Sequence, residues 1–225
     1  MRTKIYSKNN KVIDIKDWDT SGSVGDLYNR YGWEGAMAWG NLIHDELNDP
    51  KAKEKGFKGI EKNDVFLDIG ANIGMSSIRA ESCGASKIYA IEPDPDIFEA
   101  LQKNKNENWV LENIAIDSEE GMLEISKWPN YWEFRSIKAI TLDQYFQKQN
   151  IQKIDYMKVD IEGHEKTAFE NVSQETWDKI NKLFFEIHGF SDEERINFIK
   201  FYNDKGFSNH HINLWGAQDF VYFWK

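Results

Sequence analysis

The chain has 225 residues, 40% of them hydrophobic and 29% charged, which suits one soluble globular domain with a sizeable core. Its formal net charge of -10 opposes contact with a phosphate backbone, so nucleic acid is not an expected partner. The single cysteine, Cys83, excludes an internal disulfide, and the sequence shows neither a signal-like apolar block nor a membrane-spanning run. We expect a cytoplasmic protein with no membrane contact.

The first 62 residues differ in pattern from the rest. The run "KIYSKNNKVIDI" indicates two short strands around a tight turn at Asn9 and Asn10, and residues 24–47 follow a helical pattern. The polar stretch "NDPKAKEKGFKG" is the best candidate for a boundary. We predict an N-terminal extension over residues 1–62, acting as a lid, and a main domain over residues 63–225.

Beyond Asn63, apolar strand-like runs alternate with helix-length polar segments. This rhythm predicts an α/β fold, a doubly wound and mainly parallel sheet covered on both faces. Residues 121–140 depart from it and indicate a hairpin or loop excursion, and the C-terminus reads as an antiparallel hairpin joined at Gly216. The strand-like runs are "VFLDI", "SKIYAIEP", "WVLENIAI", "IDYMKVDI" and "KLFFEIH".

The stretch "DVFLDIGANIGMSSI", residues 64–78, reads as a strand, a glycine-rich turn and the start of a helix. Gly70 can adopt a positive φ and lets the backbone approach a ligand, and Gly74 lets the helix start tight against the strand. Asp68, at the strand end, can accept from an ammonium or a water. Glu92 ends the next strand, 22 residues beyond Gly70, at the offset where an acid binds a ribose diol. The pattern indicates a nucleoside site.

The turn differs from the dinucleotide fingerprint G-x-G-x-x-G. The three fingerprint positions are occupied by Asp68, Gly70 and Ile73, and a carboxylate facing a pyrophosphate would be repulsive. A cationic conjugate such as S-adenosylmethionine would instead be attracted. The alternatives are a nicotinamide-dependent oxidoreductase, a non-catalytic nucleoside-binding module, and a purely structural strand-to-helix turn.

A second constellation lies in "MKVDIEGHE", where an apolar strand leads into Asp160 and Glu162. Gly163 allows a sharp turn into a helix that we expect to start near Glu165. Both acids then crowd the carboxyl end of a central strand, where ligands of such sheets bind. The alternative is that they only cap the next helix.

The neighbouring strand "KLFFEIHG" contributes Glu186 and His188. A histidine at a strand end can act as a general base near neutral pH, or can be a core side chain bonded to a carbonyl. Together with Asp160 and Glu162, these residues offer oxygen and nitrogen ligands for a metal such as magnesium. Because no spacing enforces such a site, we expect no metal.

Several stretches, in this order, resemble the FkbM-type methyltransferases from about Asn63 to Lys225. The stretches are "VFLDIGANIGMSSI", "IYAIEPDPDIFEALQKN", "ENIAIDSEEG", "ITLDQYF", "IDYMKVDIEGHEKTAFEN" and "KLFFEIHG". The resemblance implies a class I Rossmann-like methyltransferase fold with a seven-stranded sheet. It also implies S-adenosyl-L-methionine as cofactor and O-methylation of a hydroxyl group. Residues 1–62 are not covered by it.

The resemblance also assigns site residues. Around the amino-acid end, the ribose and the adenine of the cofactor it places Asp68, Gly70, Ala71, Asn72, Gly74, Glu92, Pro93, Asn113, Ala115, Asp117 and Asp160. Positioning of the acceptor should contribute most to catalysis, and a protonated hydroxyl still needs one base. The candidates are Asp160, Glu162 and His188, with Asp160 favoured for its position.

The acceptor side is marked by the aromatic run "SKWPNYWEF". Trp128, Tyr131, Trp132 and Phe134 would suit stacking on a sugar ring, or would pack this loop onto the core. We therefore expect the acceptor to be a hydroxyl of a glycan or of a small molecule.

Overall fold

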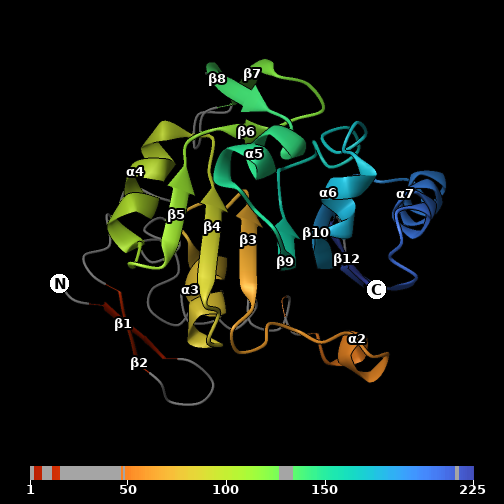
Figure 1. The fold of residues 1–225 in the computed structure, drawn as a ribbon, viewed down its shortest axis with the longest axis horizontal. Coiled ribbons are helices and arrows are strands. Elements are labelled where there is room, and N and C mark those ends of the chain that lie inside the picture. The colour runs from red at the N-terminus through yellow and green to blue at the C-terminus, as the bar shows by residue number, and fades with distance from the viewer. Residues whose placement is uncertain (1–2, 7–11, 16–46, 48, 127–133, 216–217) are drawn as a thin grey trace.

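The computed structural model describes residues 3–6, 12–15, 47, 49–126, 134–215 and 218–225. Most of its strands belong to one seven-stranded sheet, shown in Figure 1. These strands are β3 (Val65–Ile69), β4 (Lys87–Ile91), β5 (Trp109–Glu112), β9 (Ile154–Val159), β10 (Ile180–His188), β11 (Asn209–Trp215) and β12 (Gln218–Trp224). Their order in the sheet is β11-β12-β10-β9-β3-β4-β5.

The sheet is mainly parallel, as predicted. The strands β10, β9, β3, β4 and β5 run parallel to one another. The strand β12 pairs antiparallel with both β10 and β11. The predicted C-terminal hairpin is therefore confirmed, while its turn at Gly216 lies outside the described residues. β9 is the central strand, so the end of "IDYMKV" stands in the middle of the sheet's carboxyl edge.

Helices cover both faces of the sheet (Figure 1). They are α2 (Pro50–Glu54), α3 (Met75–Ser82), α4 (Pro95–Asn104), α5 (Leu142–Gln149), α6 (Gln174–Asp178) and α7 (Asp192–Asp204). One apolar core packs α2, α3 and α4 against the sheet, and the other packs α5, α6 and α7 against the opposite face. No helix among the described residues has the length and apolar character of a membrane span.

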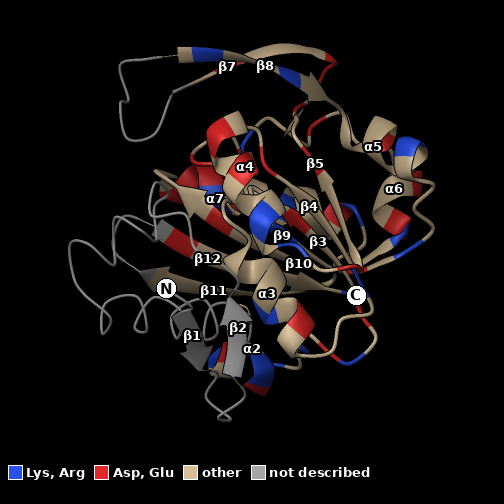
Figure 2. Ribbon diagram, turned by 90° about the vertical axis from the view of Figure 1, so that its left-hand side faces the viewer, with Lys and Arg blue, Asp and Glu red and all other residues tan. Residues whose placement is uncertain are grey.

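The predicted excursion over residues 121–140 is a hairpin. β7 (Gly121–Ser126) pairs antiparallel with β8 (Phe134–Ile140), and β6 (Ala115–Ile116) pairs parallel with β8. This small sheet projects beyond the main one in Figure 2. The N-terminal hairpin is also confirmed, because β1 (Thr3–Tyr6) and β2 (Val12–Ile15) pair antiparallel. The helical pattern predicted over residues 24–47 lies outside the described residues except for Leu47, which is helical, and the role of residues 1–62 as a lid stays a prediction.

The prediction of a helix that starts near Glu165 is wrong. Residues 162–163 and 165–171 form consecutive turns, and α6 begins at Gln174. The Glu165 side chain instead holds the turn at Gly163, since its Oε1 accepts from the backbone N–H groups of Ile161 at 3.3 Å and Gly163 at 3.1 Å.

Strand alternation collects the polar residues on one face. Along a strand, successive side chains point to opposite faces, and the even-numbered positions of β3, β9 and β10 face the core formed with α2, α3 and α4. Phe66, Tyr156 and Phe184 fill this core. Asp68 and Lys158 continue the same parity toward the carboxyl edge, so the apolar face becomes polar at its rim.

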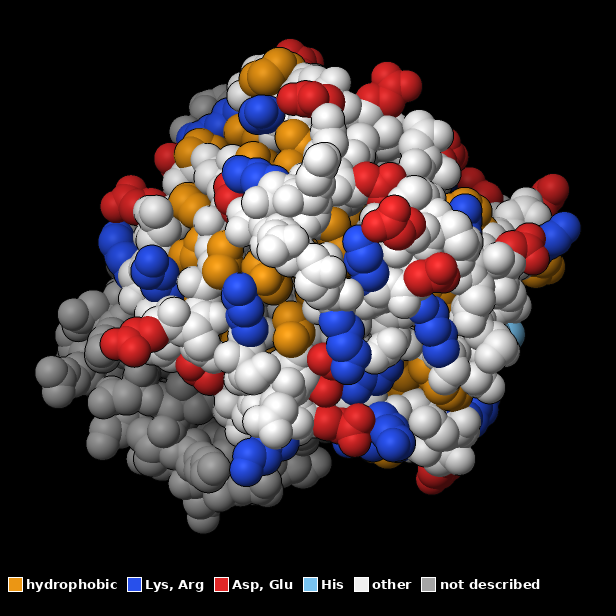
Figure 3. All heavy atoms as spheres, in the orientation of Figure 1, with side chains coloured by type: hydrophobic (Ala, Val, Ile, Leu, Met, Phe, Trp, Pro, Cys, Tyr) orange, Lys and Arg blue, Asp and Glu red, His pale blue; other side chains and the backbone are white. Residues whose placement is uncertain are grey.

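Acidic and basic side chains are interspersed on the face of the molecule that Figure 3 shows. The described residues on this face form no continuous basic surface of the kind that a nucleic-acid backbone requires.

The turn after β3 touches the end of β9 backbone to backbone. Gly70 has φ +75, and a Cβ at this position would lie 1.7 Å from the carbonyl oxygen of Asp160. The turn is also fixed to β4, because the N–H groups of Gly70 and Ala71 donate to the carbonyl of Ile91 at 3.0 and 2.9 Å. Only glycine fits this approach.

We predict that Gly70→Ala destabilises the fold by at least about 2 kcal/mol, because overpacking adds to the strain of a positive φ. The measurement is the free energy of unfolding in urea. Gly121→Ala is the matched control: a Cβ there meets nothing within 4 Å, so we expect a change below about 1 kcal/mol. Equal losses in the two variants would contradict the steric explanation.

Candidate functional site

The backbone conformation of the turn after β3 explains why small and polar residues alternate there. Gly70, Asn72 and Gly74 all adopt left-handed conformations, with φ of 75, 52 and 93. Asn72 is a residue that tolerates this region, and its Oδ1 accepts from the N–H of Ile73 at 2.8 Å. The turn therefore leads directly from β3 into α3, with Gly74 at the helix N-cap.

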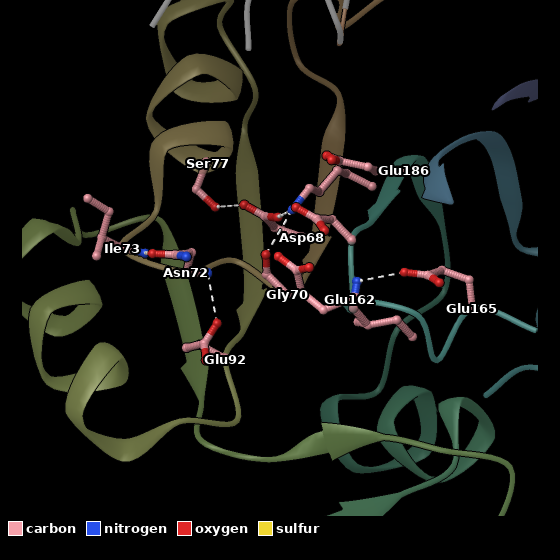
Figure 4. A network of polar contacts seen from close by, with 12 residues as sticks. Asp68, Gly70, Asn72, Ile73, Ser77, Glu92, Glu162, Glu165 and Glu186 are labelled. Carbon is pink, nitrogen blue, oxygen red and sulfur yellow. Dashed lines mark hydrogen bonds and ion pairs between the residues drawn. The ribbon is translucent and has the colours of Figure 1, made fainter. Parts of the chain in front are cut away.

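Glu92 closes the turn from the side of β4. Its two carboxylate oxygens accept from the N–H groups of Asn72 and Asp94, each at 2.8 Å, as Figure 4 shows for the first. Burial raises the pKa of Glu92 to about 7 against the effect of these two donors. Asn113 donates from Nδ2 to the carbonyls of Glu92 and Pro93, both at 2.9 Å. The acid predicted to bind ribose is thus held rigidly beside the glycine turn.

Asp68 is enclosed by the protein. Its side chain is fully buried, accepts from Ser77 Oγ at 2.6 Å and lies 3.4 Å from the Nζ of Lys158. The ammonium that it meets in the structure belongs to the chain itself. Its charge is therefore offset, and the argument that Asp68 would repel a pyrophosphate loses its weight. Direct contact between Asp68 and a cofactor stays a prediction.

Lys158 is the residue that sequence reasoning missed. Its Nζ donates to the carbonyl of Gly70 at 2.8 Å and lies 3.4 Å from both Asp68 and Asp160. Although burial opposes it, the charges of Asp160 and Asp68 hold the pKa of Lys158 above its usual range. A lysine within the apolar run "IDYMKV" was the available signal, because a buried cation needs an acidic partner.

Asp160 combines fixed position with an available oxygen. Its N–H donates to the carbonyl of Ile69 at 3.0 Å, and its Oδ2 lies near Lys158. Its Oδ1 is buried and has no hydrogen-bond partner among the described residues. Burial, together with Glu186 and Glu162, raises the pKa of Asp160 to about 6, and Lys158 acts in the opposite direction. This carboxylate is ionised at neutral pH and can accept a proton.

His188 is surrounded by acids. Its Nδ1 lies 3.1 Å from Glu165, and its Nε2 lies 3.5 Å from Glu186 and 3.7 Å from Glu162. The hydrogen bonds with Glu165 and Glu186 raise the pKa of His188 to about 10. His188 is therefore an imidazolium at neutral pH, and this state conflicts with the expected role as a base.

Glu165 is the second residue that sequence reasoning missed, since it was expected only to begin a helix. Its side chain is fully buried and fixes both His188 and the turn at Gly163. Although burial opposes it, the hydrogen bond from His188 lowers the pKa of Glu165. His164 lies on the other side of this turn, where its Nε2 is 3.0 Å from Asp117. Asp117 thus fixes the turn, and its position near the adenine of the cofactor stays a prediction.

The structure brings together most of the predicted site residues. Asp160, Glu162 and His188 meet at the carboxyl ends of β9 and β10, and Gly70, Asn72 and Glu92 meet one and two strands away. Ala115 is buried in β6. The candidate ligand atoms of Asp160, Glu186 and His188 lie within 4.8 Å of one another, so the metal alternative has a geometric basis that the sequence did not provide.

The acceptor side is described only in part. Trp128, Tyr131 and Trp132 lie outside the described residues. Phe134 begins β8 and is 66% exposed, so it is free for a contact rather than packed in the core. Arg135 follows it and reaches Asp94 at 3.2 Å, which fixes β8 to the turn after β4.

Comparison with known proteins agrees with this geometry. Residues 68–218 match the family model described as the methyltransferase FkbM domain. The hexuronic acid methyltransferase AglP of Haloferax volcanii is 24% identical over 173 residues, or 72% of this chain and 70% of that protein. The methyltransferase sdnD of Sordaria araneosa is 24% identical over 56% of this chain and 67% of its own length.

Among solved structures, a methyltransferase FkbM from Methylobacillus flagellatus superposes with a TM-score of 0.54 at 16% identity. The alignment covers 84% of this chain and 52% of that one. A likeness at this identity reports on the fold, and it confirms the predicted Rossmann-like architecture. The division of the chain at residue 62 stays a prediction.

We predict that Lys158→Met costs about 3–5 kcal/mol of unfolding free energy, because it leaves the buried Asp68 carboxylate without its cation. The double variant Asp68→Asn, Lys158→Met should recover part of the loss, and urea unfolding measures both. Lys148→Met is the control, since this lysine pairs with Glu112 at the surface and its loss should cost below about 1 kcal/mol. A double variant no more stable than Lys158→Met would contradict the charge explanation.

We predict that His188 stays doubly protonated at pH 8, as ¹⁵N NMR of the imidazole would show. Its pKa in the folded state, about 10, lies above the ordinary value, so its contribution to stability is complete below pH 6.5. That contribution disappears as the pH rises toward 10. The variant Glu165→Gln should lower the pH at which the His188 imidazole titrates. A neutral His188 ring at pH 7 in the wild type would contradict the protonated state inferred here.

Proposed function

The chain belongs to the FkbM methyltransferase family, and from this premise we propose that it transfers a methyl group to a hydroxyl of a sugar or a small metabolite. S-adenosylmethionine is the methyl donor of enzymes of this class, in agreement with the cofactor predicted from the sequence. It supplies an electrophilic methyl group on a sulfonium. The protein's own task is to position the acceptor oxygen and to remove its proton.

The residues at the switch between β3 and β4 fit such a cofactor. The glycine turn offers a close backbone approach, and Glu92 stands beside it with a carboxyl group suited to hydroxyl ligands. The buried, unpartnered Oδ1 of Asp160 adds an acceptor one strand away. An acidic set of this kind suits a sulfonium with sugar hydroxyls. The comparisons give no support to a nicotinamide-dependent oxidoreductase.

One observation supports Asp160 as the base above its neighbours: among the three candidates, it alone has a buried side-chain oxygen with no hydrogen-bond partner among the described residues. His188 holds its proton through Glu165, and Glu162 is 85% exposed. Asp160 would accept the proton of the acceptor hydroxyl, and Lys158 beside it would stabilise the carboxylate beforehand. Positioning contributes about 7–11 kcal/mol in favourable cases, and a base contributes about 10²–10⁴-fold.

Two observations favour a sugar as the acceptor. AglP of Haloferax volcanii is named for a hexuronic acid, which supports a sugar acceptor here. The exposed ring of Phe134, on the strand that follows the aromatic run, offers a flat apolar surface of the kind that stacks on sugar rings.

We predict that Asp160→Asn lowers kcat by about 10²–10⁴-fold, because the base is lost. Calorimetry measures the cofactor Kd of the variant, and rates taken at saturating cofactor separate the loss of the base from any loss of cofactor affinity. In the wild type, activity should rise through pH 6 as Asp160 ionises and should then level off.

This rise should disappear in Asp160→Asn and persist in Glu162→Gln. Near-normal turnover of Asp160→Asn with intact cofactor binding would exclude Asp160 as the base. Failure of the wild type to bind S-adenosylmethionine would refute the function itself.

A further inference from the structure

We propose that the acceptor carries a protonated amino group near the methylated hydroxyl, as an amino sugar or an amino alcohol does. The inference rests on the proposed function and names the substrate class of that site. This acceptor differs from the one for which AglP is named, because a hexuronic acid is an anion at neutral pH.

The first observation is a wall of carboxylates beside the reaction centre. Candidate ligand atoms of Asp160, Glu186 and His188 lie within 4.8 Å of one another. Glu162 approaches the same Nε2 of His188 at 3.7 Å, with its side chain 85% exposed. Figure 4 shows Glu162 and Glu186 at the strand ends on this side of the site. The wall consists of Asp160, Glu162 and Glu186.

The second observation is the charge balance. Seven charged side chains meet here, five acidic and two basic: Asp68, Asp160, Glu162, Glu165, Glu186, Lys158 and His188. Five negative and two positive formal charges leave an excess of three negative charges. Lys158 lies 3.4 Å from both Asp68 and Asp160, and His188 contacts Glu165, Glu186 and Glu162, so the two cations are shared among five carboxylates and cannot neutralise them all. The nearby Arg195 is itself offset by Asp219 at 2.5 Å and Asp192 at 2.8 Å.

The third observation separates the wall from the cofactor side. Glu92 closes β4, whereas Glu186 and His188 close β10, and both β3 and β9 lie between these strands. Adjacent strands are about 4.8 Å apart, so β4 and β10 are separated by about 14 Å at the sheet. Asp160 closes β9, which lies between β4 and β10. We assign Glu92 to the ribose, Asp160 to the sulfonium, and Glu162 and Glu186 to the acceptor.

A cation on the acceptor would offset the excess negative charge of the wall, whereas a carboxylate on the acceptor would increase it. At distances of a few ångströms outside bulk water, one charge pair changes affinity by an order of magnitude or more.

The test compares three methyl glucosides that differ only at C6: a 6-amino-6-deoxy sugar, glucose and glucuronic acid. Their charges at pH 7.5 are positive, zero and negative. Binding to the complex with S-adenosylhomocysteine is measured by calorimetry, and transfer by initial rates. We expect the amino sugar to bind at least about tenfold more tightly than glucoside and about 100-fold more tightly than glucuronide.

Glu186→Gln and Glu162→Gln should each reduce the preference for the amino sugar over glucuronide by about tenfold. The control is Glu175→Gln, because this exposed glutamate lies in α6, at the opposite end of β10, and should leave the ratio unchanged. Comparing ratios within one variant removes any general loss of folded protein.

Four results would overturn the inference. Glucuronide could bind as tightly as the amino sugar, or the ratio could be unaffected by both wall variants. Glucuronide could be preferred until a chelator removes divalent ions, and the amino sugar only afterwards, which would assign the wall to a metal. Finally, none of the three sugars could bind while S-adenosylmethionine binds normally. Loss of S-adenosylmethionine binding itself would instead refute the proposed function.

Discussion

The buried ammonium of Lys158 is the constraint on which the rest of the site depends. It joins the carbonyl of Gly70 to the carboxylates of Asp68 and Asp160, and so ties the carboxyl ends of the two central strands together. Burying a cation costs free energy unless acids surround it, and burying those acids requires the cation. Neither half is stable alone, which is why the two strand ends form one unit.

This unit explains how an ordinary α/β sheet acquires chemistry at its rim. The even positions of the central strands continue from aromatic core residues into Asp68, Lys158 and Glu186 without a change of parity. Lys158 orders Asp160, while burial and the neighbouring acids keep the pKa of Asp160 close to neutrality. The second cation, His188, is held by Glu165 in a protonated state. The result is one carboxylate that can accept a proton and a wall that carries excess negative charge.

Much of this was predictable from the sequence, and the exceptions share a cause. The strand-turn-helix around Gly70, the acid at Glu92 and the position of Asp160 follow from local rules of spacing, and the seven strands of the sheet follow from the family resemblance. The roles of Lys158 and Glu165 depend on partners 88 and 23 residues away, which no local pattern reveals. The protonated state of His188 follows from its long-range contact with Glu165.

The central claim is that the glycine turn, Glu92 and Asp160 form one cofactor-binding edge. A crystal structure of the chain with S-adenosylhomocysteine tests it most directly. The account predicts the ribose hydroxyls on Glu92 and the sulfur on the side of the turn that faces Asp160. A nucleoside bound away from Glu92, or a sulfur turned away from Asp160, would contradict it.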